Sequence, residues 1–268
     1  MHSTPSLQGR TALVTGASRR SGIGYAVAAR LASMGASIVL HHHRPHDADQ
    51  PWGADDLAQV RAGIEALLGP GAAVHDLPAD LADPDAPSAL LEGAVARAGH
   101  LDILVCNHAR SGGDATLADM DVEKLDGHWS VNTRATLLLT QAFAAQHDGR
   151  EGGRAIWMTS GQQQGPMAGE VAYAASKAAL AGVTATVASE LARRGILLNT
   201  VNPGPVNTGY LDPGMGIPDD ALADLRQAFP SGRLGEPDDP ARLIAWLVSD
   251  EGRWMVGQVL NTEGGFRL

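Results

Sequence analysis

The sequence contains one cysteine, few aromatic residues and no excess of basic residues. Because Cys106 is alone, it cannot form an internal disulfide, and this fits a reducing compartment. Aromatic residues make up 4% of the 268 residues and hydrophobic residues 44%, so a sizeable core must consist mainly of Ala, Val, Leu and Ile. The formal net charge of −10 argues against nucleic acid as a partner and gives no reason to expect an anionic membrane.

Long apolar runs and targeting signals are missing as well. No run approaches the roughly 18 residues of a membrane span. The first residues, M-H-S-T-P-S-L-Q, lack the basic-then-apolar order of a signal peptide. We therefore expect a cytoplasmic protein in which residues 1–8 form an N-terminal tail.

Strand and helix patterns alternate along the rest of the chain without a linker or a sequence repeat. Short apolar runs from Thr11–Thr15 to Gln258–Asn261 are typical of buried strands, and Asp121–His147 carries a long helical pattern. The alternation predicts an α/β fold. We expect a single Rossmann-like, doubly wound domain over residues 9–268, with a mostly parallel seven-stranded sheet and helices on both faces. Residues 205–231, rich in Pro, Gly and Asp, are predicted to form a substrate lid.

Polar and turn-forming residues follow several of these predicted strands. They lie at or just past a strand end in each case: Gly16, Asp80, Asn107, Ser160 and Pro203. Ligands of doubly wound sheets bind at the carboxyl ends of the strands. One rule therefore places all these candidates on a single rim.

A glycine-rich stretch, T-G-A-S-R-R-S-G-I-G, runs from Thr15 to Gly24 between a predicted strand and a predicted helix. Gly16 permits a tight turn, and Gly22 and Gly24 let the backbone come close to a pyrophosphate. The start of the helix then presents free N–H groups and the positive end of its dipole to that anion. Many loops are rich in glycine, so the position between strand and helix is what indicates dinucleotide binding.

Tyr173 and Lys177 lie four residues apart in an Ala-rich segment with strong helix propensity. At this spacing both side chains share one helix face, and an ammonium near a phenol lowers the pKa of that phenol. Ser160, at the end of the preceding predicted strand, is placed to hold a substrate carbonyl against such an acid. The alternative is a surface Tyr and Lys on an ordinary helix, which Ser160 and the other motifs disfavour.

Two other polar groups have structural alternatives. The run His41-His42-His43 suggests a metal site, but on a strand His42 faces away from its neighbours and no cluster of Cys or carboxylates completes the ligand set. We therefore expect no metal. Asn132, in the middle of a predicted helix, is either a structural hydrogen-bonding residue or part of a polar relay.

Taken together, these motifs resemble the short-chain dehydrogenase/reductase family, in particular the branch that includes 3-oxoacyl-acyl-carrier-protein reductases. The likeness runs from about Gly9 to Phe266 and includes the C-terminal stretches G-R-L-G-E-P-D-D and G-Q-V-L-N-T-E-G-G. It implies a catalytic set of Asn132, Ser160, Tyr173 and Lys177. It also implies a set of cofactor-binding residues: Gly16, Ser18, Arg19, Gly22, Ile23, Gly24, Arg44, Asp80, Leu81, Asn107, Ala109, Tyr173, Lys177, Pro203, Gly204, Val206 and Thr208.

Three features depart from the family pattern. The glycine turn is two residues longer than the usual T-G-x-x-x-G-x-G and carries Arg19-Arg20-Ser21 at its tip. The family's N-N-A-G segment reads C-N-H-A here, so His108 stands where the family has a small residue and either binds substrate or fills space. Gln162, Gln163 and Gln164, after Ser160, are more polar than the family's residues and favour a polar substrate, and Gln162 and Gln163 are the candidate substrate-binding residues.

The resemblance implies hydride transfer between a nicotinamide cofactor and a carbonyl or secondary alcohol. Tyr173 is then the general acid/base, Ser160 bonds the carbonyl oxygen, Lys177 supports the phenolate and the nicotinamide ribose, and Asn132 holds a water. Two alternatives stay open. One is a non-catalytic NADP(H)-binding regulator on the same fold, and the other is an epimerase or dehydratase that forms a transient ketone.

The expected cofactor is NADP(H) rather than NAD(H). The second predicted strand ends at His43 and Arg44, and no carboxylate follows until Asp47, so nothing nearby repels a 2′-phosphate. Arg44 and Arg19 are suited to bind that phosphate, although surface arginines often point to solvent. The family's assembly mode implies a homotetramer, with a dimer as the fallback.

Overall fold

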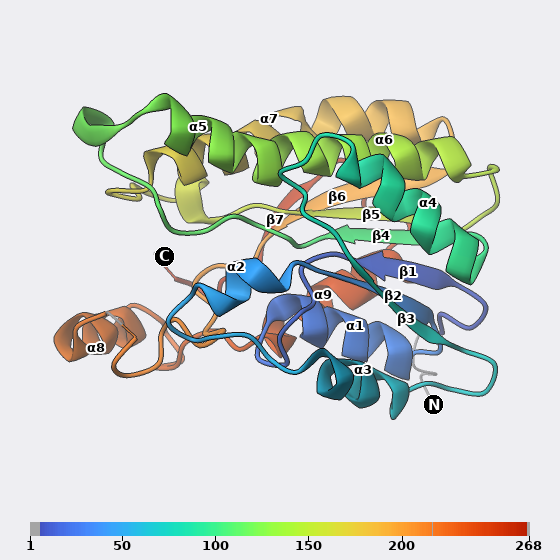
Figure 1. Cartoon of the computed structure of the whole chain (residues 1–268), viewed down its shortest axis with the longest axis horizontal. Helices are drawn as coiled ribbons and strands as arrows, with labels where there is room; N and C mark the ends of the chain where they lie inside the picture. Colours follow the sequence, from blue (N-terminus) through green and yellow to red (C-terminus); the bar gives the residue numbers. More distant parts are fainter. Residues whose placement is uncertain (1–5, 216, 267–268) are drawn as a thin grey trace.

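A single parallel sheet forms the centre of the molecule (Figure 1). The computed structural model describes residues 6–215 and 217–266, and in this part of the chain seven strands pair in the order β3-β2-β1-β4-β5-β6-β7. All the pairings are parallel, so the expectation of a mostly parallel sheet holds without exception. The strands are β1 (Thr11–Val14), β2 (Ser37–His42), β3 (Val74–Pro78), β4 (Ile103–Cys106), β5 (Gly153–Met158), β6 (Ile196–Asn202) and β7 (Val259–Asn261).

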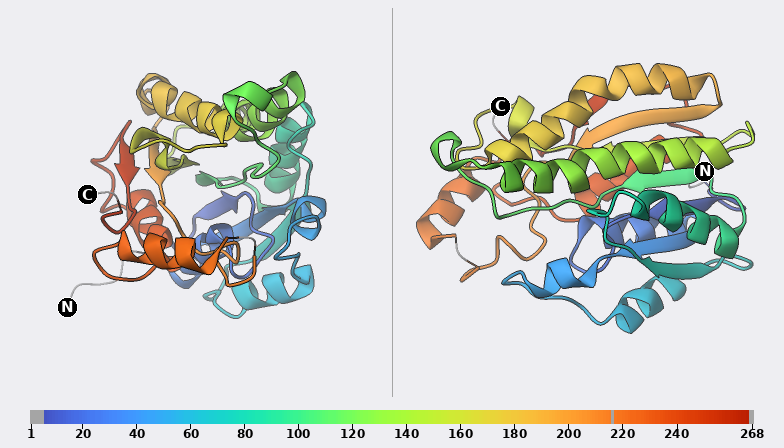
Figure 2. Two further views of the ribbon diagram at one scale, coloured as in Figure 1. Left: turned by 90° about the vertical axis from the view of Figure 1, so that its left-hand side faces the viewer. Right: turned by 45° about the horizontal axis from the view of Figure 1, so that its top comes forward.

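Helices cover both faces of this sheet, because each parallel connection must cross over it. On one face lie α1 (Ile23–Ser33), α3 (Leu57–Glu65) and α9 (Asp238–Val248). On the other lie α4 (Ala86–Ala98), α5 (Val122–His128), α6 (Ala135–Gln146) and α7 (Val171–Ala192) (Figures 1 and 2). Each face has its own core of mainly aliphatic side chains, as the low aromatic content requires.

The folded part of the chain begins before residue 9. Leu7 is fully buried, its N–H donates to the carbonyl of Met34 at 2.8 Å, and its own carbonyl accepts from Arg10 N–H at 3.0 Å. The expected tail therefore ends earlier than residue 8, because the apolar side chain of Leu7 is buried in the core near the carboxyl end of α1.

The predicted long helix from Asp121 to His147 is interrupted. A π-helical segment, η2 (Trp129–Arg134), separates α5 from α6. Thr133 Oγ1 donates across the layer to the carbonyl of Ser176 at 2.9 Å. Such segments recur at functional sites, and this one presents Asn132 and Thr133 to α7.

Residues 205–231 project from the carboxyl ends of the strands, as predicted for a lid. They contain α8 (Asp219–Gln227), which lies apart from the main helix layers in Figure 1 and in the right-hand view of Figure 2. The segment has a small apolar core of its own, in which Leu222 is buried and Phe229 stacks on Phe266 at 5.1 Å between ring centroids. The lid is therefore a packed unit rather than an unstructured loop.

By length and composition, one helix in the described part of the chain, α7, is apolar enough to cross a membrane. Here α7 packs along β6, with Leu180 and Leu191 buried in the core of that face. The core helices of many folded domains pass the same compositional test, so α7 provides only weak evidence for a membrane span.

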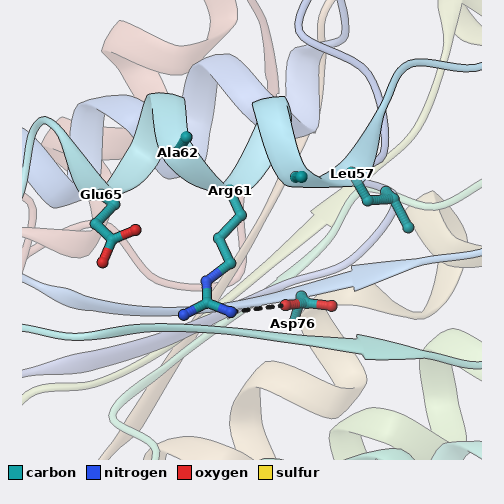
Figure 3. A pocket seen from close by; sticks show the side chains of 6 residues that line it. Leu57, Arg61, Ala62, Glu65 and Asp76 are labelled. Atoms are coloured by element: carbon teal, nitrogen blue, oxygen red, sulfur yellow. Dashed lines mark ion pairs between the residues drawn. The ribbon is translucent and has the colours of Figure 1, made fainter.

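A shallow groove runs between α3 and β3 at the edge of the sheet (Figure 3). Arg61 crosses it toward Asp76, with 3.9 Å between guanidinium nitrogen and carboxylate oxygen, and Leu57 and Ala62 form its apolar wall. The groove contains none of the predicted site residues. It therefore lies outside the candidate site.

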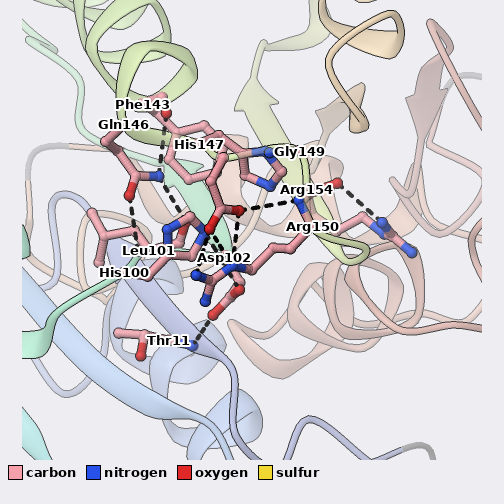
Figure 4. A network of polar contacts seen from close by, with 12 residues as sticks. Thr11, His100, Leu101, Asp102, Phe143, Gln146, His147, Gly149, Arg150 and Arg154 are labelled. Carbon is pink, nitrogen blue, oxygen red and sulfur yellow. Dashed lines mark hydrogen bonds and ion pairs between the residues drawn. The ribbon is translucent and has the colours of Figure 1, made fainter.

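The amino ends of the strands are held by a buried polar network (Figure 4). Asp102 Oδ2 accepts the N–H of Thr11 at 2.8 Å, and its carbonyl accepts the N–H of Arg154 at 2.9 Å. Gln146 pairs with both backbone groups of Leu101. Side chains thus tie together the starts of β1, β4 and β5, at the opposite edge of the sheet from the lid.

Candidate active site

A cavity of about 1400 Å³ lies at the carboxyl ends of the strands, beneath the lid. The left-hand view of Figure 2 looks onto this edge of the sheet. The five residues that the strand-end rule gathered all line this cavity: Gly16, Asp80, Asn107, Ser160 and Pro203. The rule therefore predicted the location of the site.

Most of the other predicted site residues line the same cavity. They are Ser18, Arg19, Gly22, Ile23, Leu81, His108, Ala109, Tyr173, Lys177, Gly204, Val206 and Thr208. Five predicted residues do not form its wall: Gly24, Arg44, Asn132, Gln162 and Gln163. Gly24 and Asn132 are buried next to residues of the wall, whereas Arg44, Gln162 and Gln163 lie outside the lining.

The glycine turn has the close packing that a pyrophosphate site needs. Gly16 has a positive φ of 65°, and a Cβ there would come within 2.8 Å of His108 Cα. A Cβ on Gly24 would lie 2.4 Å from the carbonyl oxygen of Gly16. In the described structure no side chain caps the start of α1 at Gly22, which leaves its N–H groups free for an anion. The turn therefore fits a dinucleotide phosphate.

Two buried histidines brace this turn, and both are neutral. His41 Nδ1 accepts the N–H of Gly16 at 3.2 Å, so the proton is on Nε2, which faces the carbonyl of Ala79 at 3.1 Å. Burial lowers the pKa of His41 to about 4. His41 thus links β2 to the glycine turn and to the segment just after β3, a role that the sequence did not indicate.

His108 has the same kind of role at the end of β4. Its Nε2 faces the carbonyl of Val131 at 3.1 Å, and its Nδ1 lies 2.7 Å from Thr15 Oγ1. Burial lowers the pKa of His108 well below its ordinary value. Because both ring nitrogens already have partners within the protein, His108 fills space and joins the end of β1 to η2. Neither ring nitrogen is left to bind a substrate, so these contacts favour the space-filling alternative.

Tyr173, Lys177 and Ser160 converge on the cavity from α7 and from the end of β5. Lys177 Nζ lies 5.7 Å from the centre of the Tyr173 ring and donates to the carbonyl of Met158 at 3.0 Å. Burial raises the pKa of Tyr173 to about 12, and a hydrogen bond with Ser160 opposes this change. Burial also lowers the pKa of Lys177 to about 8.

The direction of the Tyr173 shift corrects a prediction from spacing. The four-residue interval does bring the ammonium close to the phenol ring, but the expected lowering of the Tyr173 pKa is absent from the described structure. Burial disfavours the phenolate more than its neighbours favour it, and it destabilises the charge on Lys177 as well. Tyr173 is therefore a protonated acid in the chain alone.

Asn132 is fully buried and its side chain is used in structure. Its Oδ1 accepts the N–H of Arg110 at 2.7 Å, while its Nδ2 donates to the carbonyl of Arg110 at 3.2 Å and to Ser176 Oγ at 3.0 Å. Asn132 thus joins η2 to α7 and to the loop after β4. Of the two alternatives from sequence, these contacts support the structural one.

Asp114 and His128 are a pair that sequence reasoning missed. Asp114, in the loop after β4, accepts the N–H groups of Ala172 at 3.0 Å and Tyr173 at 2.7 Å, and so caps α7 from a distant segment. The fully buried ring of His128 lies 3.9 Å from the Asp114 carboxylate and edge-on to Tyr173, at 6.0 Å between centroids. No local pattern indicates a cap supplied 57 residues before its helix, from Asp114 to Val171.

The loop after β2 also differs from expectation. Residues Arg44–Ala48 form a short helix, α2, with Pro45 in its first turn. This helix leaves Arg44 exposed and away from the cavity, and turns Asp47 inward, where it accepts a hydrogen bond from Ser18 and pairs with Arg19 at 3.6 Å. Arg44 is therefore not a phosphate ligand in this arrangement, and a carboxylate does stand close to the turn.

Of the three glutamines after Ser160, only Gln164 lines the cavity. Ser160 leads into a 3₁₀ turn, η3 (Gly161–Gln163), which carries Gln162 and Gln163 away from the cavity. Gln164 lines the cavity instead, and its Oε1 accepts from Asn202 Nδ2 at 2.8 Å. Met167, Leu211, Met215, Ile217 and Leu225 also line this part of the cavity. The substrate side therefore carries more apolar side chains than the preference drawn from the glutamines suggested, beside the polar Gln164, Glu170 and Tyr210.

In residues 6–215 and 217–266, no group of three or more His, Cys, Asp or Glu side chains is arranged to hold a metal ion. Within the histidine run, neighbouring rings face different carboxylates. His42 Nε2 lies 3.5 Å from a carboxylate oxygen of Asp76, and His43 Nε2 lies 4.0 Å from one of Asp80.

Comparisons with known proteins agree with the site. A family model described as Enoyl-(Acyl carrier protein) reductase matches residues 16–267. The chain is 38% identical over 261 residues to the uncharacterized oxidoreductase YjdA of Bacillus subtilis (strain 168), covering 97% of each. It is 34% identical over 268 residues to the NADPH-dependent aldehyde reductase-like protein, chloroplastic, of Arabidopsis thaliana, covering 97% of this chain and 95% of that one.

Solved structures agree as well. A short-chain dehydrogenase/reductase from Serratia marcescens BCRC 10948 has a TM-score of 0.83 and 32% identity, over 98% of this chain and 99% of that chain. The matched residues include the glycine turn, the Tyr173 helix and the lid. The chain thus belongs to the short-chain dehydrogenase/reductase family, whose members are oxidoreductases that use NAD(P)(H).

Proposed function

We propose that the chain transfers hydride between NADP(H) and a small carbonyl or secondary alcohol with a mainly apolar body. The observation that carries this proposal is convergence: Tyr173, Ser160 and Lys177 line the same cavity as the glycine turn. A regulator that only bound the cofactor would have no use for a buried, protonated phenol beside a serine hydroxyl. The apolar lid residues around that phenol support the substrate class.

Each residue has a distinct part in this reaction. When bound, the nicotinamide cofactor supplies or accepts the hydride. In reduction, Tyr173 donates its proton to the carbonyl oxygen, and Ser160 holds that oxygen in place. Lys177, anchored to the carbonyl of Met158, stabilises the phenolate that remains. Asn132 positions α7 against the loop after β4.

The direct test is consumption of NADPH in the presence of a panel of small apolar ketones and aldehydes. We expect absorbance at the reduced-cofactor band to fall as alcohol appears in equal amount. Tight NADPH binding with no turnover on any compound would favour the regulator. Product formation without net cofactor oxidation would favour the epimerase or dehydratase.

The cofactor proposal is NADP(H) over NAD(H). Arg19 lines the cavity beside Ser18, and the Arabidopsis relative is described as NADPH-dependent. Arg19→Ala is expected to lower the preference for NADPH over NADH by about ten- to a hundredfold, since a charge-assisted contact contributes roughly 1.5–3 kcal/mol. Arg44→Ala is the matched control and should change nothing, because Arg44 is exposed outside the cavity. NADH binding as tight as NADPH binding by the unmutated chain would contradict this assignment.

We also propose a cytoplasmic homotetramer. On α5 and η2, Leu125 is 41% and Trp129 49% exposed, and the outer face of α7 carries the small residues Ala178, Gly182 and Ala185. A closed symmetric assembly would bury these helices against a second copy. Light scattering should give four times the mass of one chain, and Trp129→Glu should lower that mass. A monomer at micromolar concentration would refute the tetramer and the dimer alike.

A further inference from the structure

Two segments at the carboxyl edge of the sheet form one structural unit. One is the lengthened glycine turn with Arg19 and Arg20. The other is the segment 43–56 after β2, here called the strap. Asp47 of the strap binds Ser18 and Arg19, and Asp55 Oδ2 accepts the N–H of Arg20 at 2.7 Å. The two extra arginines of the turn thus meet two aspartates of the strap, and each segment holds the other in place.

The strap contacts the lid at the carboxyl edge of the sheet. It starts at β2 and meets the lid that follows β6, four strand spacings or about 19 Å away in the sheet order. Trp52 makes the contact: its ring lies edge-on to Tyr210 at 6.2 Å between centroids, and its Cβ lies 3.3 Å from the place of a Cβ on Gly209. In Figure 1 the strap, which includes α2, faces the lid side of the molecule.

Arg19 completes a bridge between turn, strap and lid. Its Nη2 donates to the carbonyl of Thr208 at 2.8 Å, and its guanidinium lies 5.5 Å from the centre of the Trp52 ring. In sheet order, β4 and β5 lie between the turn and the lid. The contact therefore joins segments that leave the sheet on either side of the strands followed by Asn107 and Ser160.

The cavity continues on both sides of this bridge. Ser18, Asp80 and Leu81 line it on the side of the expected adenosine, and Ser160, Tyr173 and Lys177 line it on the reacting side. The strap itself lines the cavity with His43, Pro45, His46, Asp47, Gln50 and Trp52. A dinucleotide that occupies both ends must pass Arg19 and Trp52, which also line the cavity.

We propose that Trp52 is a cofactor-retaining residue: the bridge of Arg19, Trp52 and the lid closes over the phosphates of the bound dinucleotide and must open before the cofactor leaves. This inference rests on the proposed cofactor use, and it adds a binding element outside the glycine turn. The cation–π contact of Arg19 and the edge-on contact of Tyr210 with Trp52 oppose opening. Loss of both contacts should therefore accelerate dissociation about tenfold.

The experiment measures cofactor release directly, without turnover. The whole chain is loaded with NADPH and mixed rapidly with excess NADP⁺, and the fluorescence of bound NADPH is followed as it decays. Trp52→Ala should release NADPH about tenfold faster than the unmutated chain. Trp254→Ala is the matched control: Trp254 is 93% exposed in the turn before β7, and its loss should leave the release rate unchanged.

The possible outcomes distinguish failure of the proposed bridge from failure of the proposed function. A release rate in Trp52→Ala equal to that of the control overturns the bridge while leaving the proposed function intact. Absence of any nicotinamide cofactor binding by the unmutated chain overturns both. If Trp52→Ala does not fold, Trp52→Phe takes its place: this ring is smaller, so release should be faster by roughly threefold, and an unchanged rate is the contrary result.

Discussion

Replacing Tyr173 with phenylalanine is expected to lower the turnover number for ketone reduction by about 10²–10⁴-fold, the usual contribution of a general acid. The substitution removes one hydroxyl and keeps the ring, so the packing against His128 and Lys177 remains. The NADPH dissociation constant should stay within about threefold, because the phosphate-binding turn lies on another strand end. Steady-state rates and fluorescence titration of NADPH measure the two quantities.

The chain offers a matched control for this experiment. Tyr25→Phe removes a hydroxyl from α1, which covers the opposite face of the sheet, where that oxygen lies beside Gly63 of α3. Its turnover number should match that of the unmutated chain. Near-normal ketone reduction by Tyr173→Phe would show that the proton comes from another group, and the proposed role of Tyr173 would be wrong.

Gly24→Ala should weaken cofactor binding by about ten- to a hundredfold and destabilise the chain. The added Cβ would lie 2.4 Å from the carbonyl oxygen of Gly16 and 2.7 Å from Asn107 Nδ2. Neither atom can move freely, since Asn107 Nδ2 donates to the carbonyls of Thr15 and Gly16 at 3.1 and 3.0 Å. Overpacking of this kind costs about 1–3 kcal/mol and here displaces the turn itself.

Thermal melting and NADPH titration check this expectation, with Gly93→Ala as the control. Gly93 lies in α4, and a Cβ there would meet its nearest neighbours at 3.6 Å, an ordinary contact. This helical Gly→Ala change should be neutral or stabilising by up to about 1 kcal/mol, with unaltered cofactor binding. Equal NADPH affinity in Gly24→Ala and Gly93→Ala would mean that the glycine turn does not shape the phosphate site.

The sequence predicted best what depends on chain order. Alternating strand and helix patterns require crossovers in one hand, so the sheet, its helix layers and the rim with Gly16, Asn107 and Ser160 followed from general rules. Arg44 was misplaced because Pro45 opens a short helix, and only the folded chain shows which way that helix turns Asp47. The π-helical segment η2 was missed because its residues carry an ordinary helical pattern.

Contacts between distant segments account for the other differences. Asp114 caps α7, and His41 accepts a hydrogen bond from the glycine turn. Both hydrogen bonds join distant segments, so no local sequence pattern predicts them. For Tyr173 the spacing correctly gave proximity to Lys177, but the pKa depends on burial, which only the assembled cavity determines. The proposed bridge at Trp52 has the same origin, since it joins residues about 150 positions apart along the chain.

The buried network at the amino ends of the strands has a practical consequence for protein engineering. A six-residue strand such as β5 spans about 20 Å, so Asp102 and Arg154 lie well beyond the 7–10 Å within which substitutions usually influence one another. Thermostabilising changes confined to that edge should therefore leave selectivity and catalytic rate untouched. Conversely, the lid can be varied to admit new substrates while the buried network at the opposite edge holds the open sheet together.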